Sequence, residues 1–236
     1  MRTLVLIILT ITLFSCAKKE VKLPTLATKG VQEIHNHSQI WFFFDISNND
    51  TIAKVNARNT ISTTHWIFNI DKRLPLKLII PNVTKLQEKH SKSLHVSDNM
   101  HNYFSYADTI SKHLSFLEFD NVNYKTDSLI SKLYIKKNNE DYKNFNNINI
   151  TINPKNNWIN DSKIEKNEFK TTLQEFIDFS SEEKLTMLHL NFNQNLVYQE
   201  YLYYKTFLES LKSTSILTNK TEFIFNPNKV PNCDCE

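Results

Sequence analysis

Two histidines and an acid near the N-terminus are the first candidates for metal chemistry in this sequence. His35 and His37 stand two positions apart, so that both imidazoles would face the same side of an extended segment, and Glu33 lies close by. A metal site and a plain polar segment both remain open, because two ligands of one type do not define a site without a third. The overall expectation is that the protein holds no metal.

Other residues that could bind metal or take part in redox chemistry occur further along the chain. Cys233-Asp234-Cys235 could close a strained disulfide, join another chain, bind a soft metal, or simply form a frayed tail. Further candidates are histidines within a segment whose structure the sequence leaves unassigned, and surface or half-buried positions are expected for them: His90, His95, His101 and His113.

Catalytic motifs do not stand out. The chain has a single glycine, Gly30, which excludes the glycine-rich phosphate cradles of the P-loop and the dinucleotide-binding fingerprint. It also excludes the Gly-x-Ser-x-Gly nucleophile elbow, and no Ser-His-Asp or Cys-His order is evident. The formal net charge is +3 with lysines scattered among acids, so nucleic acid is not expected as a partner. The sequence therefore predicts a protein that is not an enzyme and has no cofactor.

The N-terminal segment has the features of an export signal. An apolar run from Leu4 to Phe14 follows one basic residue and ends at Ser15-Cys16. As a helix this run spans about 16 Å, well short of the roughly 30 Å hydrocarbon core, so it suits a signal peptide rather than a membrane span. The segment resembles those of bacterial lipoproteins, which are cut before a cysteine that carries palmitate or related acyl chains. The resemblance implies a membrane-anchored protein facing the periplasm, with a signal peptide at 1–15, lipidation at Cys16 and a lipidated tether at 16–33.

The elements that must position these residues follow from hydrophobic periodicity. In the first half we expect strands at 39–46, 51–55, 61–70 and 114–119 and a helix over 75–90. In the second half we expect strands at 148–152, 158–159, 185–192 and 222–225 and helices over 169–177 and 197–211. This order predicts an α+β protein with helices packed on one face of small mixed sheets. A polar connector at 136–147 separates the expected domains, which are 34–135 and 147–227, with a Cys-containing tail at 228–236.

The second half, from about Asn147 to Asn226, resembles the periplasmic domain of the biopolymer-transport family called ExbD/TolR. The resemblance rests on a strand that ends in a polar turn, Leu190 to Asn195, followed by Val197-Tyr198 at a helix start, where the family has a strand, an Asp, a short turn and Val-Pro-Tyr. This chain has Asn193 at the Asp and lacks the family's glycines. The resemblance implies dimerisation and contact with protein partners or the cell wall. The family's proton-coupled motor role does not carry over, because the leader contains no carboxylate.

The first half is a candidate for a diverged second copy of this domain. Phe68 to Leu74 aligns with Leu190 to Leu196, and both segments lead into a helix. The first half lacks the crossover helix expected between the second and third strands.

The expected function is that of a non-catalytic envelope lipoprotein that engages a protein partner or the cell wall, as an accessory to an envelope transport system. A homodimer is a further expectation. The alternative is a lipid-anchored metal-binding protein or hydrolase that uses the His-rich first half. Four tyrosines on one helix exceed what a small core needs, so part of that helix is expected to contact a partner through Tyr198, Tyr201, Tyr203 and Tyr204.

Overall fold

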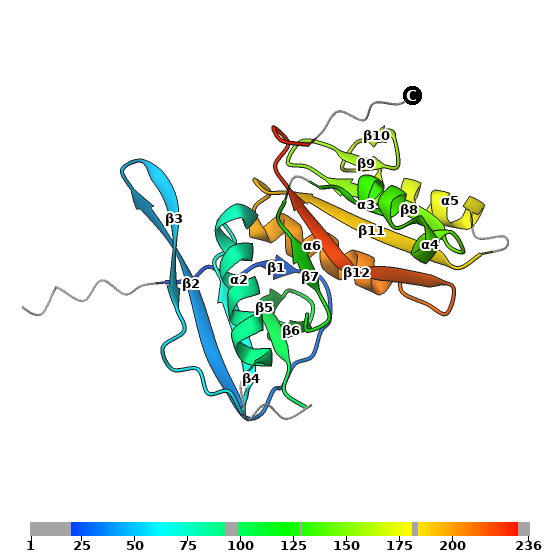
Figure 1. The fold of residues 1–236 in the computed structure, drawn as a ribbon. Helices are drawn as coiled ribbons and strands as arrows, with labels where there is room; N and C mark the ends of the chain where they lie inside the picture. The colour runs from blue at the N-terminus through cyan, green and yellow to red at the C-terminus, as the bar shows by residue number, and fades with distance from the viewer. Residues whose placement is uncertain (1–19, 93–98, 128, 181–183, 231–236) are drawn as a thin grey trace, which may run out of the picture.

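The computed structural model describes residues 20–92, 99–127, 129–180 and 184–230 (Figure 1). Two six-stranded sheets make up most of this part of the chain, and helices pack on them. Both sheets contain parallel and antiparallel neighbours. The predicted α+β class is confirmed.

The first sheet has the strand order β1-β5-β4-β2-β3, and β6 pairs with β5. Its strands are β1 (Thr25–Leu26), β2 (His37–Ser47), β3 (Asp50–Asn56), β4 (His65–Ile70), β5 (Asn102–Asp108) and β6 (Leu114–Glu118). The helix α2 (Leu76–Ser91) connects the parallel strands β4 and β5. It buries Leu76, Ile79, Ile80 and Val83, and the helical spacing of Ile79, Val83, Leu86 and His90 is the signal that predicted it.

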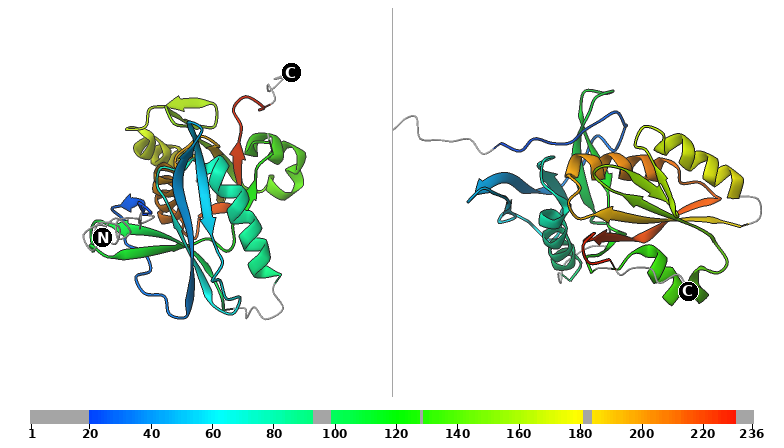
Figure 2. Two further views of the ribbon diagram at one scale, coloured as in Figure 1. Left: turned by 90° about the vertical axis from the view of Figure 1, so that its left-hand side faces the viewer. Right: turned by 90° about the horizontal axis from the view of Figure 1, so that it is seen from above.

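The second sheet has the order β10-β9-β8-β11-β12-β7. Its strands are β7 (Asn123–Lys125), β8 (Asn146–Ile152), β9 (Asn157–Ile159), β10 (Ser162–Ile164), β11 (Thr186–Asn193) and β12 (Ile216–Phe225). Its helices are α3 (Ser131–Lys137), α4 (Asn139–Tyr142), α5 (Phe169–Ser180) and α6 (Tyr198–Ser210). Seen from above in Figure 2, α5 and α6 lie on one side of this sheet and α3 and α4 on the other.

The two halves share one arrangement of strands. The central order β3-β2-β4-β5 of the first sheet matches β9-β8-β11-β12 of the second, with antiparallel hairpins and parallel central pairs in both. The register matches as well, since Phe68 of β4 lies opposite Ile40 and its counterpart Leu190 of β11 lies opposite Ile150. Residues 57–64, which join β3 to β4, contain no helix, whereas α5 lies between β10 and β11.

The halves meet where each central strand turns into its helix. Pro75 and Val197 form an isolated antiparallel bridge. On one side the Leu76 N–H donates to the Leu196 carbonyl at 3.0 Å, and the Tyr198 N–H donates to the Leu74 carbonyl at 2.9 Å. These residues correspond at a constant offset of 122, as from Pro75 to Val197, so the junction is close to two-fold symmetric.

One hydrophobic core crosses this junction. A single cluster of buried apolar side chains includes residues from both sheets. The Phe104 ring of β5 packs edge to face on Tyr198 and Tyr201 of α6, with centroids 5.7 Å and 6.3 Å apart. The two halves therefore stabilise each other through shared apolar burial.

The predicted tether at 16–33 is largely wrong. The Lys22 N–H donates to the Asp71 carboxylate at 3.0 Å, β1 pairs with the edge of β5, and Val31 exchanges backbone hydrogen bonds with Phe116. Gly30 packs so closely that a Cβ there would lie 2.3 Å from the Tyr106 hydroxyl. Backbone pairing fixes the described part of this segment, and such pairing needs no hydrophobic pattern in the sequence.

The predicted domain boundary at 136–147 is also misplaced. The chain already enters the second sheet at β7, which pairs in parallel with β12, and α3 then packs beside β11. The first sheet therefore ends at Glu118, before the predicted limit of 135. A three-residue edge strand is too short to show a period, so hydrophobic periodicity could not predict β7.

Candidate functional site

Three of the four tyrosines expected to contact a partner lie in the core. Tyr198 and Tyr201 are fully buried, and Tyr204 is 4% exposed and accepts a hydrogen bond from Asn157. The partner-binding prediction is therefore wrong for these three residues. The helical spacing of the tyrosines in the sequence does not reveal how much of the helix surface other elements cover. In the structure α6 is in contact with side chains of both sheets.

One of these tyrosines, Tyr201, belongs to a buried polar network. Lys205 Nζ lies 2.5 Å from Glu222 Oε1, and both side chains are at most 2% exposed. The Tyr201 hydroxyl donates to Glu222 Oε2 at 2.8 Å and lies 3.1 Å from the Tyr124 hydroxyl. Burial, together with the Glu222 charge, raises the pKa of Tyr124 and of Tyr201 well above the ordinary value. The tyrosines therefore stay neutral, and the network joins β7, α6 and β12.

Tyr203 is the exposed member of the four, at 42%. The Lys170 ammonium lies 4.7 Å from the ring centroids of both Tyr203 and Phe207, and Lys166 pairs with Glu200 beside them. We call these five residues the Tyr203 patch. A cavity of about 350 Å³ opens next to it. Aromatic rings and paired charges of this kind are common in protein interfaces.

The structure does not bring His35 and His37 together as a metal site. Both are exposed; the His37 ring is bonded to the Ile34 carbonyl at 2.8 Å, and His35 lies 3.7 Å from Glu33. His113 is exposed in the turn between β5 and β6. Among the residues that the structure describes, none of these three belongs to a cluster with metal-ligand geometry.

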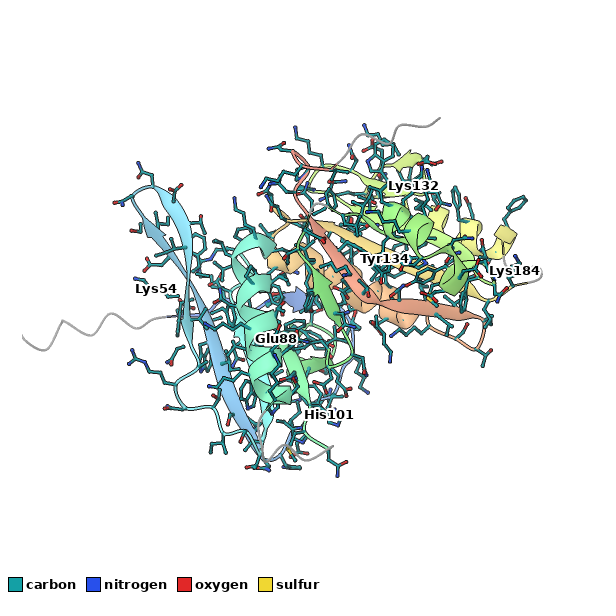
Figure 3. All side chains as sticks on the ribbon, viewed as in Figure 1. Lys54, Glu88, His101, Lys132, Tyr134 and Lys184 are labelled. Carbon is teal, nitrogen blue, oxygen red and sulfur yellow. The ribbon has the colours of Figure 1, made fainter. Side chains whose placement is uncertain are left out.

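A different set of residues converges where β5 and β6 meet, at the lower edge of the first sheet in Figure 3. His101 precedes β5, Glu118 ends β6, and Asp120 follows it. His101 Nδ1 lies 2.6 Å from Asp120 Oδ2 and 3.6 Å from Glu118 Oε1. The antiparallel register explains this convergence: Tyr103 lies opposite Glu118, so His101 and Asp120 face each other two residues further along.

Neighbouring residues hold this cluster in place. Asn102 donates both its backbone N–H and its side-chain amide to Asp120 Oδ1, at 2.6 Å and 2.7 Å. The His101 N–H donates to His65 Nδ1 at 3.1 Å, and the two imidazole rings stack with centroids 5.6 Å apart. Burial, and after it the nearby His101, lowers the pKa of His65, so His65 stays neutral and accepts this bond.

His90 lies close to the cluster and is itself engaged. It is 2% exposed, its ring stacks on Trp66 at 4.1 Å, and its nitrogens lie 3.0 Å from Asn102 Oδ1 and 3.2 Å from the Ser62 carbonyl. Each ring nitrogen thus lies beside an oxygen atom, and the tautomer decides which nitrogen donates. Its role in this arrangement is to fix Asn102, which in turn fixes Asp120.

Comparison with known proteins adds no assignment. No family model matches the chain, and no curated protein or solved structure matches it either.

The arrangement at the end of β5 and β6 offers one imidazole nitrogen and two carboxylates to a cation. The three side chains also line a cavity of about 710 Å³ between α2 and the segment after β6. Sequence reasoning named His101 but missed Glu118 and Asp120. The available signal was Glu118-Phe119-Asp120 at a strand end, since alternate residues of a strand share a face.

Several predicted features lie outside the described residues. These are the signal peptide with Cys16, His95, and the tail residues Cys233, Asp234 and Cys235. Within the described ranges, no helix combines the length and apolar character that crossing a bilayer requires.

Proposed function

We propose that this protein is a cell-envelope lipoprotein, held on the membrane by lipid on Cys16 and facing the periplasm. Its folded part engages a protein partner and catalyses no reaction. The leader from Leu4 to Phe14 and the cysteine that follows it support the anchor.

The position of Lys22, near the start of the described residues, supports a body held close to the bilayer. The backbone of Lys22 is bonded to Asp71, so only about six residues separate Cys16 from the folded part. Fully extended, these residues reach about 20 Å. A lipid on Cys16 would therefore keep the surface around Lys22 and Arg73 next to the headgroups, and partners would approach from the remaining sides.

The fold of the second half is the observation that carries the binding role. Its order of β8, β9, β10, α5, β11, α6 and β12 contains the β-β-α-β-α-β order expected for an ExbD/TolR-like domain, with the short edge strand β10 in addition, and that resemblance implies binding of envelope partners. The first half repeats the central strand order and pairs with the second around Pro75 and Val197. We propose that the two paired halves form a rigid scaffold for binding rather than a catalytic framework.

The Tyr203 patch is the surface that best suits such a partner. Tyr203 is 42% exposed on a helix whose other side is fixed in the core, so its ring is held in place before any partner arrives. Lys170 and the pair formed by Lys166 and Glu200 supply charge around the ring. An aromatic centre with a charged rim is a common interface arrangement.

A photo-crosslinking side chain placed at position 203 tests this role in growing cells. We expect a discrete crosslinked product on the envelope-bound protein from position 203. The matched control is position 110, where Ile110 is 66% exposed in the turn after β5 and lies far from α6 in sequence. Equal products from both positions, or none from position 203, would contradict a partner at this patch.

A further inference from the structure

We propose that His101, Glu118 and Asp120 bind a divalent transition-metal cation, with zinc as the first candidate. Each residue contributes one ligand atom, and these atoms lie within 4.8 Å of one another. The site goes beyond the proposed partner binding, which does not require a metal.

The distances suit a metal with little rearrangement. Zinc bonds to nitrogen and oxygen are about 2.0 to 2.2 Å long, which puts two ligand atoms of a tetrahedral site roughly 3.4 Å apart. His101 Nδ1 and Glu118 Oε1 are already 3.6 Å apart. The pair of His101 Nδ1 and Asp120 Oδ2, now a 2.6 Å hydrogen bond, needs to open by less than about 1 Å. The proton shared there moves to Nε2 or leaves when the cation takes its place.

Neighbouring residues hold two of the three proposed ligands by hydrogen bonds and ring stacking, as residues around metal ligands usually do. Asn102 holds Asp120 Oδ1 with two hydrogen bonds, which leaves Oδ2 directed at His101. His65 fixes the backbone of His101 and stacks on its ring. Outer contacts of this kind orient ligands and commonly change metal affinity by about 10-fold to 100-fold when removed.

Three protein ligands leave at least one coordination position open. The ligand set faces a cavity of about 710 Å³, which can admit water or a small anionic ligand to that position. An imidazole with two carboxylates favours zinc, manganese or iron over the soft cations that prefer thiolates. The structure thus points to an exchangeable cation site rather than a closed structural one.

Other groups around the cavity are less suited to ligate. Glu88 pairs with Lys92 at 3.1 Å, and both nitrogens of His90 are engaged. The Glu118 carboxylate, by contrast, is 45% exposed and has the 3.6 Å contact with His101 as its ion pair among the described residues. Glu118 is therefore the ligand that can be changed with the least effect on folding.

The test is zinc titration by calorimetry of the chain without residues 1–16, which keeps every described residue. We expect one equivalent of zinc to bind the unmodified chain, and Glu118→Gln to weaken binding at least 10-fold with an unchanged thermal midpoint in metal-free buffer. Glu88→Gln, a carboxylate change in the same cavity, is the matched control and should bind like the parent.

Two outcomes would overturn the site. One is a parent chain that binds no stoichiometric zinc, or a Glu118→Gln variant that binds as tightly as the parent. The other is loss of binding in the variant with Cys233 and Cys235 changed to Ser, or in the one with His35 and His37 changed to Ala, while Glu118→Gln binds normally. Cobalt substitution gives a second readout, since the proposed ligands produce no thiolate-to-cobalt charge-transfer band and a cysteine site would.

Discussion

Pro75 and Val197 lie opposite each other in an antiparallel bridge at which the two halves of the chain meet. The hydrogen bonds around this bridge occur in matched pairs. The Lys77 N–H donates to the Gln194 carbonyl at 2.8 Å, and the Gln199 N–H donates to the Lys72 carbonyl at 3.1 Å. The turns before the helices match too, with the Asp71 carboxylate capping the Arg73 N–H and the Asn193 amide oxygen capping the Asn195 N–H. The two halves are thus held in one fixed relationship.

The symmetric junction predicts a single unfolding transition. Leu74 and its counterpart Leu196 are both fully buried, so replacing either with Ala should cost about 2 to 5 kcal/mol. Because the core is continuous, each variant should move the same transition in urea, followed by circular dichroism and by tryptophan fluorescence. Two transitions, of which each variant moves only one, would show that the halves fold independently.

The packed N-terminal segment predicts an effect at Gly30. A methyl group there would lie 2.3 Å from the Tyr106 hydroxyl and 2.8 Å from the Phe116 carbonyl oxygen. Gly30→Ala should therefore destabilise the protein by about 1 to 3 kcal/mol in urea titration. Lys29→Ala, at an exposed neighbour, serves as the control and should have little effect. A flexible tether would instead tolerate both changes equally.

The burial of neutral His189 predicts that the protein loses stability in mild acid. Burial lowers the pKa of His189 to about 4, and its neutral ring donates from Nε2 to Asn147 and accepts at Nδ1 from Asn219. In the unfolded chain the pKa of His189 is about 6.5. Above that pH the residue is neutral in both states, so its full contribution to the free energy of unfolding is present. As pH falls from 6.5 to 4 the unfolded state gains the proton first, which removes about 3 kcal/mol of the free energy of unfolding.

Urea unfolding at pH 7 and pH 4 measures this loss. His189→Gln keeps a donor and an acceptor but does not titrate, so its stability should fall by about 3 kcal/mol less between the two pH values than that of the parent. The same fall in both proteins would contradict a neutral buried His189.

The ion pair between Lys205 and Glu222 predicts a strong asymmetry between single and double changes. Glu222→Gln leaves the Lys205 ammonium buried without its main partner and should cost about 3 to 5 kcal/mol. The double change Lys205→Met with Glu222→Leu removes both charges and should lower the free energy of unfolding by less than Glu222→Gln alone. Glu140→Gln, in an exposed pair with Lys143, should cost less than about 1 kcal/mol. Urea titration of the three variants compares these values, and a double variant less stable than Glu222→Gln would contradict the expectation.

Hydrophobic periodicity predicted the elements that bury one apolar face. α2 has buried residues at helical spacing, and β11 is a nearly continuous apolar run in the middle of a sheet, so both were expected within two residues of their observed bounds. The strand β5 was missed. Its sequence, Asn102 to Asp108, mixes aromatic and polar residues that are nearly all buried, so it shows neither the alternation of a half-exposed strand nor a plain apolar run.

The candidate cation site was not predicted from the sequence for a related reason. His101 and Asp120 are brought together by the antiparallel register of β5 and β6, and the sequence did not reveal β5. The partner-binding prediction for the tyrosines of α6 failed for the opposite reason. Their spacing was visible, but the coverage of the helix by a second half of the chain depends on the junction at Pro75 and Val197.

Acylation of Cys16 is the most direct measure of the proposed envelope role. Cells expressing the tagged protein are fed labelled palmitate and fractionated, alongside cells expressing Cys16→Ser. We predict that the parent protein carries the label and is found in the membrane fraction. The Cys16→Ser protein should be unlabelled and should be absent from the membrane fraction. An unlabelled parent, or a Cys16→Ser protein that stays on the membrane at the parent's size, would contradict a lipid-anchored protein.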